Sequence, residues 1–347
     1  MKQYKVAVIL SSKIFGGHEF QSIELFKEVC KYFDATLFVN HSLDVSLFKD
    51  KHLHYIKPEL PLFKSGNFLS QFYYSVKYGK KIRKLFNGYT HIIVCAGTVE
   101  AGISLGYILR NKVSFLYVPM YIDRIILWGR IGCLYNLLTG IFVYPYKKII
   151  TINRIQGKLF SKYKFIVVVP NRIFDEQELI QIKSPTNRRL YFVGRIEAIK
   201  GLYTLINWLD TSQNPFHEFV IVGDGSEKPF LEKHVTQLKY LRVTFKGWLS
   251  YSEQEKEFSS RDIYITNSSF EGEPLAIREA NRRGSVVIAK DIVGHKGCTH
   301  RKNRFRNKQE LLHCLSLANA NKLKVFENQS IEEIDVLREK TVRQLFL

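Results

Sequence analysis

Two cationic side chains are the first residues in this sequence whose type and spacing suggest chemistry. Arg195 and Lys200 stand five positions apart in one loop, directly after the apolar run Leu190–Val193. Arg presents a planar fork that matches phosphate oxygens, and Lys presents a compact positive charge. The flanking Gly194 and Gly201 permit a ligand to approach the backbone closely. The loop is therefore predicted to bind phosphate, and a solvated loop that leads into a helix is the alternative.

A helix start follows the apolar run Ile263–Thr266 and offers a second anion-binding element. Pro274 suits the first turn of a helix, so the amides of Leu275 and Ala276 should point out of the helix N-terminus toward an anion. Glu279 lies four residues after Leu275 and shares a helix face with those amides. Its carboxylate can accept hydrogen bonds from two neighbouring hydroxyls, as a ribose presents them.

Glu271 precedes that helix in the loop and can bind the hydroxyls of a sugar in the same way. Both glutamates have structural alternatives. Glu279 could pair with Arg282 or Arg283 on the helix surface. Glu271 could serve only as a negative charge near the helix N-terminus.

The first half of the chain contributes Gly16 and Gly17, which follow the first apolar run and precede a helix expected to begin near Phe20. Two adjacent glycines offer bare backbone to a phosphate or sugar held by the opposite domain. They do not form the spaced glycine pattern of a dinucleotide-binding fold, which is therefore disfavoured.

The elements that must position these residues are short apolar strands that alternate with longer amphipathic stretches. This alternation indicates parallel sheets covered by helices on both faces. The pattern restarts near Leu190, and 347 residues exceed one comfortable core, so two α/β domains are expected. The predicted strands are Lys5–Leu10, Ala35–Val39, His91–Cys95, Val113–Val118, Lys148–Ile152, Ile166–Val169, Leu190–Val193, Glu218–Val222, Arg242–Phe245, Ile263–Thr266 and Val286–Ala289.

The charge is strongly asymmetric along the chain. Residues 1–169 carry 24 Lys and Arg against 9 Asp and Glu, whereas the remainder carries 28 against 23. A basic surface suits nucleic acid, anionic lipid or a polyanionic substrate, or serves only for solubility. No nucleic-acid-binding motif accompanies it, so no nucleic-acid partner is expected.

Three stretches predict surface or terminal helices. Phe68–Phe86 mixes aromatic residues with lysines, which suits either a helix at a membrane interface or an ordinary amphipathic helix on the sheet. Ile131–Tyr146 carries no charge but is shorter than the roughly 20 residues of a spanning helix, so a helix that lies on a surface remains open. A terminal helix is expected over Ile331–Leu347, with one apolar face of Ile331, Ile334, Leu337 and Leu345.

Taken in their order, these motifs resemble the retaining glycosyltransferases of family 4, which have the GT-B fold. The matching landmarks are Gly16-Gly17, Val169-Pro170-Asn171, Gly194-Arg195 with Lys200-Gly201, Gly223-Asp224-Gly225, Phe245-Lys246-Gly247, and Glu271 with Glu279 in an E-x7-E arrangement. The resemblance implies two Rossmann-like domains with parallel sheets facing across a cleft. Residues 1–169 would form an acceptor-binding domain, residues 170–325 a nucleotide-sugar-binding domain, and residues 326–347 a helix that returns to the first domain.

The resemblance also implies roles. Arg195 and Lys200 would neutralise the donor diphosphate, Glu279 would bind the ribose, and Glu271 would contact the transferred sugar. Further donor contacts would come from Gly16, Gly17, Gly194, Gly247, Trp248, Gly272, Leu275 and Ala276. Such enzymes need no metal and no cofactor besides a UDP-sugar or GDP-sugar donor, because fixed cations stabilise the leaving diphosphate.

Three positions depart from the family pattern. The region Val118-Pro119-Met120-Tyr121 lacks the histidine that many members carry after an N-terminal-domain strand. His18 stands beside Gly17 and could compensate for the missing histidine, but a surface position is expected for it. Glu273 replaces the usual aromatic residue in the loop beside the sugar, where it could alter the sugar preference or have no effect.

The leading hypothesis is a retaining hexosyltransferase that extends a glycan or lipid-linked acceptor in lipopolysaccharide or cell-surface polysaccharide synthesis. The expected location is the cytoplasm, and peripheral attachment to the anionic inner face of the cell membrane stays open as an alternative to a freely diffusing protein. A GT-B sugar-nucleotide epimerase is an alternative, and interconversion of donors without acceptor would identify it. A catalytically silent protein that binds the membrane surface is the third, and absence of sugar-nucleotide binding would favour it.

Overall fold

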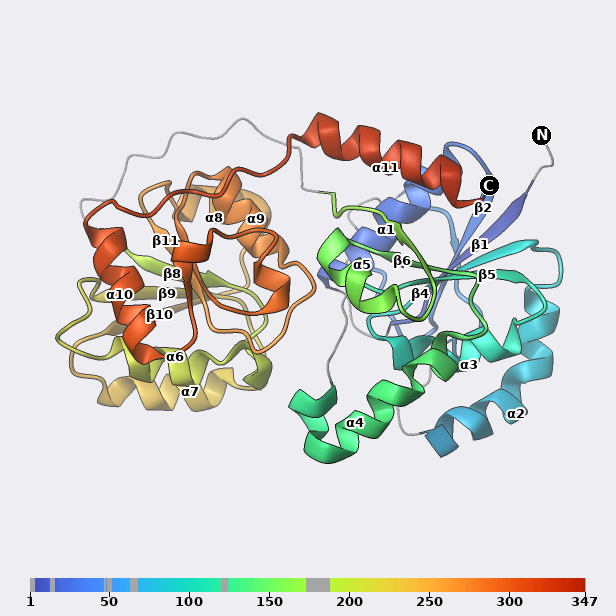
Figure 1. The fold of residues 1–347 in the computed structure, drawn as a ribbon, viewed down its shortest axis with the longest axis horizontal. Coiled ribbons are helices and arrows are strands. Elements are labelled where there is room, and N and C mark those ends of the chain that lie inside the picture. Colours follow the sequence, from blue (N-terminus) through green and yellow to red (C-terminus); the bar gives the residue numbers. More distant parts are fainter. Residues whose placement is uncertain are drawn as a thin grey trace. The chain divides into compact units, whose positions relative to one another are not determined.

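The computed structural model of the chain describes residues 4–12, 16–46, 48, 52–62, 68–119, 124–172 and 188–346. The chain divides into two compact units, shown in Figure 1. Unit 1 comprises residues 1–172 together with 331–347, and unit 2 comprises residues 173–330.

Unit 1 is built on a seven-stranded, all-parallel sheet in the order β3-β2-β1-β4-β5-β6-β7. The strands are β1 (Lys5–Leu10), β2 (Asp34–Val39), β3 (Tyr55–Ile56), β4 (His91–Cys95), β5 (Val113–Tyr117), β6 (Lys148–Thr151) and β7 (Phe165–Val168). Six of the seven were predicted to within one residue at each end. The exception is β3, which consists of only two residues. Both are exposed, and no apolar run marks the strand in the sequence.

Helices cover both faces of this sheet because alternate residues of each strand point to opposite sides. Val6 and Val8 of β1 face a core shared with α1 (Gly17–Cys30) and α11 (Ile331–Leu345). Ala7 and Ile9 face the other core, shared with α2 (Phe68–Leu85), α3 (Val99–Ile108), α4 (Arg124–Val143) and α5 (Arg154–Phe160). Figure 1 shows α2, α3 and α4 gathered on one side of unit 1 and α11 on another.

The buried face of α11 differs from the predicted one. Ile334, Val342 and Leu345 are buried, whereas Leu337 is exposed. The position expected for Leu337 is taken by Arg338, which is buried and donates a hydrogen bond from Nη1 to the carbonyl oxygen of Pro170. Apolar spacing alone placed Leu337 inside, but a buried guanidinium with a carbonyl acceptor fills that site.

Unit 2 contains a six-stranded, all-parallel sheet in the order β10-β9-β8-β11-β12-β13. The strands are β8 (Leu190–Val193), β9 (Glu218–Val222), β10 (Arg242–Gly247), β11 (Ile263–Thr266), β12 (Val287–Lys290) and β13 (Arg304–Phe305). The helices are α6 (Leu202–Leu209), α7 (Lys228–His234), α8 (Tyr251–Glu257), α9 (Leu275–Arg282) and α10 (Lys308–Asn319). One continuous core joins them, with Tyr191, Phe192 and Phe219 among its largest buried side chains.

The strand order of unit 2 reverses between β8 and β11. From β8 the chain adds β9 and β10 on one side, and from β11 it adds β12 and β13 on the other. The loops after β8 and β11 therefore diverge from a topological switch point, where ligands bind in open parallel sheets. Both predicted phosphate-binding motifs lie in these two loops.

Candidate functional site

The loop after β8 is held by backbone contacts at both ends. At its start, the amide of Gly194 donates to the carbonyl of Val222 at 3.0 Å, and the amide of Ile196 donates to Asp224 at 2.8 Å. At its end, a single 3₁₀ turn spans Ala198–Lys200 and closes on Gly201, which has a φ of 61°. A β-carbon at Gly201 would lie 2.8 Å from the carbonyl oxygen of Asn267, so glycine is required there.

The loop after β11 is joined directly to this one. The amide of Ser269 donates to the carbonyl of Ile199 at 2.8 Å, and the side-chain amide of Asn267 donates to the carbonyl of Gly201 at 3.1 Å. These bonds flank Lys200 on both sides. The two loops thus form one connected backbone frame around the lysine.

Lys200 and Glu271 meet inside this frame. The Lys200 ammonium donates to Glu271 Oε1 and forms an ion pair with it. The two side chains are only 18% and 16% exposed, so solvent screens their interaction less than at an open surface. Two of the three residues expected to act on the donor are therefore in contact.

Arg195, the third of these residues, belongs to the same loop and is exposed. Within the part of the chain that the structure describes, its side chain makes no hydrogen bond and no ion pair. A guanidinium that no carboxylate neutralises can bind an anion with its full charge.

The N-terminus of α9 supplies backbone donors in the same loop region. Pro274 is the N-cap, one position before the predicted first turn, with φ −70° and ψ 121°. The first intrahelical bond runs from the amide of Ile277 to the carbonyl of Pro274 at 3.1 Å. Among the described backbone hydrogen bonds, none uses the amides of Leu275 or Ala276, which precede that bond. They have the position of the donors that bind anions at helix starts.

The two glutamates of the E-x7-E arrangement, Glu271 and Glu279, both influence the buried Tyr264 hydroxyl electrostatically. The Tyr264 hydroxyl donates to the carbonyl of Val193, the last residue of β8, at 3.3 Å. Burial raises the pKa of Tyr264, and the negative charges of Glu271 and Glu279 raise it further. Both carboxylates therefore lie within electrostatic reach of the β8 terminus. Arg283, one proposed partner of Glu279, instead bonds Glu255 at 2.7 Å and the Tyr191 hydroxyl at 3.0 Å.

Two residues after β12 complete the surroundings of Glu271 and were not expected from the sequence. A β-carbon on Gly294 would lie 2.1 Å from the backbone oxygen of Glu271. The neighbouring His295 is fully buried, and its Nδ1 lies 2.7 Å from the carbonyl of Lys290. The only sequence signal for this pair was its place after a strand.

His295 is neutral at physiological pH. Burial is the main cause that lowers its pKa to about 4, Glu271 opposes the shift, and Lys200 adds to it. A neutral imidazole whose Nδ1 carries the proton donates to Lys290, and its Nε2 is then an acceptor. In the described part of the chain this buried Nε2 has no hydrogen-bond partner.

Glu273 does not present a free carboxylate to a sugar. Its side chain is buried and forms an ion pair with Arg278, one turn into α9. The pair anchors the loop to the helix, and it favours the alternative in which Glu273 does not alter the sugar preference.

Gly247 is the last residue of β10, and Trp248 follows it at the same edge of the sheet. Gly247 has a φ of 67°, and its carbonyl accepts a hydrogen bond from the Gly223 amide at 2.7 Å. The indole of Trp248 is 73% exposed. An exposed aromatic ring of this kind offers a surface on which a nucleotide base can stack.

In unit 1, the predicted glycine pair lies at the start of α1. Gly16 is the N-cap, and the helix begins at Gly17, three residues before the expected start. His18 stacks on Tyr117 with 5.5 Å between ring centroids, and burial lowers its pKa. Both ring nitrogens are buried, so the expected surface position of His18 is wrong. In the region that lacks the family histidine, Met120 and Tyr121 fall outside the described residues.

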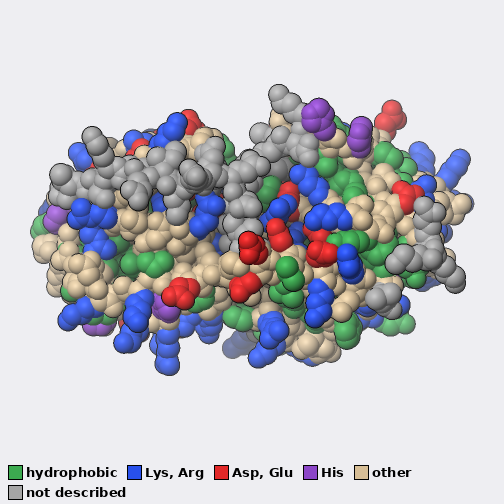
Figure 2. Space-filling model, turned by 90° about the horizontal axis from the view of Figure 1, so that it is seen from above, with side chains coloured by type: hydrophobic (Ala, Val, Ile, Leu, Met, Phe, Trp, Pro, Cys, Tyr) green, Lys and Arg blue, Asp and Glu red, His purple; other side chains and the backbone are tan. Residues whose placement is uncertain are grey.

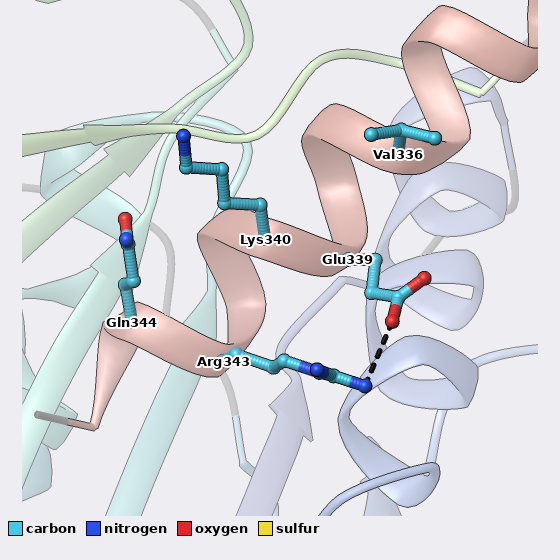
Figure 3. Close-up of a pocket in the computed structure, with 5 residues that line it drawn as sticks. All are labelled: Val336, Glu339, Lys340, Arg343 and Gln344. Carbon is cyan, nitrogen blue, oxygen red and sulfur yellow. Dashed lines mark ion pairs between the residues drawn. The ribbon is translucent and has the colours of Figure 1, made fainter.

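The hollow drawn in Figure 3 belongs to the exposed face of α11 in unit 1. Its lining residues are Val336, Glu339, Lys340, Arg343 and Gln344, and Glu339 pairs with Arg343 at 2.9 Å. All five of these described residues come from one helix, so we assign no chemistry to this depression. Within the described ranges, no three His, Cys, Asp or Glu side chains gather closely enough to hold a metal ion.

The two Rossmann-like units with parallel sheets define the GT-B fold, as predicted, and solved structures confirm it. The chain superposes on the apo form of the lipopolysaccharide outer core galactosyltransferase WaaB with a TM-score of 0.68 and 15% identity, covering 97% of this chain and 95% of that one. On sucrose-phosphate synthase from Thermosynechococcus elongatus it superposes with a TM-score of 0.73 and 15% identity, covering 99% of this chain and 97% of that one. On Anabaena Alr3699/HepE in complex with UDP and glucose it superposes with a TM-score of 0.68 and 16% identity, covering 99% of both chains.

The sequence comparisons match part of the chain. Residues 174–302 match the family model "Glycosyl transferases group 1". A curated relative, an uncharacterized 41.2 kDa protein in the cps region of Klebsiella pneumoniae, is 26% identical over 140 residues, which are 38% of each chain. Together with the fold, the family match supports a GT-B glycosyltransferase.

Proposed function

We propose that this protein transfers a hexose from a UDP-sugar or GDP-sugar to a glycan or lipid-linked acceptor, with retention of anomeric configuration as in glycosyltransferase family 4. The pathway we propose is lipopolysaccharide or cell-surface polysaccharide synthesis. The observation that carries the proposal is the frame around Lys200. It places an ammonium, a carboxylate and the start of α9 at the switch point of unit 2.

The donor reaction needs stabilisation of a leaving group. Breaking the bond between sugar and diphosphate leaves negative charge on the phosphate oxygens. Lys200, Arg195 and the amides of Leu275 and Ala276 are fixed positive groups or dipoles that can stabilise this charge without a bound metal. Removing one such donor from an enzyme site typically costs about 10²- to 10³-fold in rate.

The pairing of Lys200 with Glu271 suggests what donor binding changes. In the structure the Lys200 ammonium is neutralised by the Glu271 carboxylate. On donor entry the diphosphate takes over the ammonium, and Glu271 becomes an acceptor for sugar hydroxyls. The close contact of Gly294 with the Glu271 backbone keeps this carboxylate in position.

We assign the remaining donor contacts from the places of the residues in the fold. Glu279 binds the ribose hydroxyls, and Trp248 with Gly247 contacts the base. In unit 1, Gly16 and Gly17 at the start of α1 offer amides to a substrate group.

The relatives are consistent with this substrate class. HepE was solved with UDP and with UDP-glucose, and WaaB is described as a lipopolysaccharide galactosyltransferase. The Klebsiella relative is encoded in a cps region. These descriptions support a nucleotide-sugar donor and a polysaccharide role for the present chain.

Donor hydrolysis and transfer should be measured with a panel of UDP-sugars and GDP-sugars. We expect Arg195→Ala and Glu279→Ala to lower turnover of the preferred donor, the former by about 10²-fold or more. Arg301→Ala removes an exposed arginine from the amino end of β13 and is the matched control. Unaltered turnover in both site variants would reject the assignment.

A further inference from the structure

A row of large apolar side chains is exposed along α4 and the turn after it. Spacings of three and four residues place these side chains on one face of the helix. They are Ile131, Leu134, Leu137, Ile141 and Tyr144, between 53% and 73% exposed. The opposite face is buried through Thr139, Phe142 and Val143. A contiguous exposed apolar row of this kind marks an interaction site.

The neighbouring helix α2 combines exposed apolar and basic residues. It packs on the sheet through Tyr74 and Ile82, while Phe72, Tyr73 and Val76 are 63–68% exposed. Only some of the large apolar side chains of α2 therefore face the core, and the others face solvent. The exposed basic residues beside it are Lys77, Lys80, Lys81, Arg83 and Lys84.

Both helices lie on the same side of unit 1, with α3 between them. The side chain of Gln71 in α2 donates to the carbonyl of Glu100 in α3 at 3.3 Å. The hydroxyl of Tyr107 in α3 donates to the carbonyl of Ile141 in α4 at 2.8 Å. All three helices contribute to one core on one face of the sheet (Figure 1).

The basic excess of the chain is concentrated in residues 60–172, which include α2, α3 and α4. Residues 60–172 contain 17 Lys and Arg but only two acidic residues, Glu100 and Asp123, which gives +15 of the net +20. Neither α2 nor α4 contains an acidic residue. By contrast, acidic and basic side chains are interspersed on the face of unit 1 that carries α11 (Figure 2).

We propose that the exposed surface of α2 and α4, formed by Phe72, Tyr73, Val76, the lysines of α2 and the apolar row of α4, docks onto an anionic lipid bilayer. The apolar residues would enter the interface between headgroups and acyl chains, and the lysines would contact lipid phosphates. Among the described helices, none is long and apolar enough to cross a bilayer, so the helices would lie on the membrane.

Charge decides between a bilayer and a second copy of this chain as the occupant. A two-fold dimer would place the same surface of both copies together. The lysines of α2 would then face like charges, which disfavours the contact. An anionic lipid surface instead neutralises the lysines, and its acyl chains bury the apolar row of α4.

The test uses the full-length chain and vesicle flotation, which does not depend on transferase activity. Vesicles of phosphatidylglycerol and phosphatidylcholine in equal amounts should carry the protein, and vesicles of phosphatidylcholine alone should carry much less. Lys80→Ala with Lys84→Ala should weaken binding by about 30-fold, since each cation near a charged membrane contributes about fivefold. The charge-matched control is Lys233→Ala with Lys239→Ala, two exposed lysines of unit 2, which should bind as the wild type does.

A second variant tests the apolar contribution. Leu134→Ser with Leu137→Ser should abolish the binding that remains at high salt, where electrostatic attraction is screened. The control is Phe230→Ser with Tyr240→Ser, two exposed aromatic residues of unit 2. All four positions are exposed, so thermal midpoints should stay close to wild type.

Three results would overturn the proposal. The first is an absence of wild-type binding to either vesicle. The second is an equal loss of binding in the control variants. The third is a wild-type dimer that Leu134→Ser with Leu137→Ser converts to a monomer, with no lipid binding in either form.

Discussion

Removing the negative charge of Glu271 should tighten the binding of a nucleoside diphosphate and slow the transfer of sugar. This carboxylate neutralises Lys200, which the diphosphate is proposed to need. Glu271→Gln keeps the shape and a hydrogen-bond acceptor for the ammonium but removes the charge that competes with phosphate.

The magnitude follows from the geometry of the pair. A phosphate that shares the Lys200 ammonium with Glu271 would lie about 4–5 Å from the carboxylate, where two unit charges interact by about 1–4 kcal/mol depending on the local dielectric. Because both side chains retain some exposure, we expect a value near the lower end, about 1–2 kcal/mol. This corresponds to roughly 5- to 30-fold tighter binding.

Isothermal titration of UDP and GDP against wild type, Glu271→Gln and Lys200→Ala measures this effect. Lys200→Ala should weaken binding of the preferred nucleotide, and Glu271→Gln should still tighten binding in the Lys200→Ala background, because the carboxylate repels the phosphate with or without the ammonium. Glu232→Gln, which neutralises an exposed carboxylate on α7, should leave the affinity unchanged. Donor turnover should fall in Glu271→Gln despite tighter nucleotide binding.

The reasoning would be refuted if Glu271→Gln weakened nucleotide binding as much as Lys200→Ala does. That result would mean that the carboxylate holds the lysine in its binding position and does not compete with phosphate.

Three further predictions concern unit 2. Gly201→Ala should lower the thermal midpoint and weaken nucleotide binding, because its φ of 61° and the contact with Asn267 exclude a β-carbon; an unchanged midpoint would contradict this. Arg283→Leu should cost about 3–5 kcal/mol in urea unfolding, since it leaves the buried Glu255 charge unpaired, and a loss below about 1 kcal/mol would argue against the pair. His295→Gln should make the free energy of unfolding depend less on pH between pH 7 and pH 5. The folded pKa of about 4 lies below the ordinary histidine pKa of 6.5, so the unfolded chain binds the proton first and the free energy of unfolding decreases as the pH is lowered. Wild type should therefore lose about 2 kcal/mol between pH 7 and pH 5 that the variant keeps, as urea midpoints at both pH values would show.

The strands of both sheets were predictable because each buried parallel strand is a short apolar run bounded by polar or glycine residues. The edge strands β3 (Tyr55–Ile56) and β13 (Arg304–Phe305) were not, since two residues carry no periodic signal. The face of α11 was misassigned because apolar spacing cannot reveal that Arg338 finds a carbonyl acceptor inside the core.

The site was predictable where a motif follows a strand. Lys200 and Glu271 were placed at the carboxyl ends of β8 and β11, which adjoin in the sheet, and the structure brings them into contact. Gly294 and His295 were missed because their role arises from packing of the loop after β12 against Glu271, a contact between segments more than 20 residues apart. The anchoring role of Glu273 could not be predicted, because its partner Arg278 is identified only by the folded loop.

The central claim is that the frame around Lys200 binds a pyrophosphate, and comparing mono- and diphosphate affinities tests it most directly. Titration of wild type with UMP, UDP, GMP and GDP should show a clear preference for the diphosphate of one base, and Lys200→Ala should remove most of that preference. Equal affinity for the mono- and diphosphate, or a preference that survives Lys200→Ala unchanged, would contradict the claim.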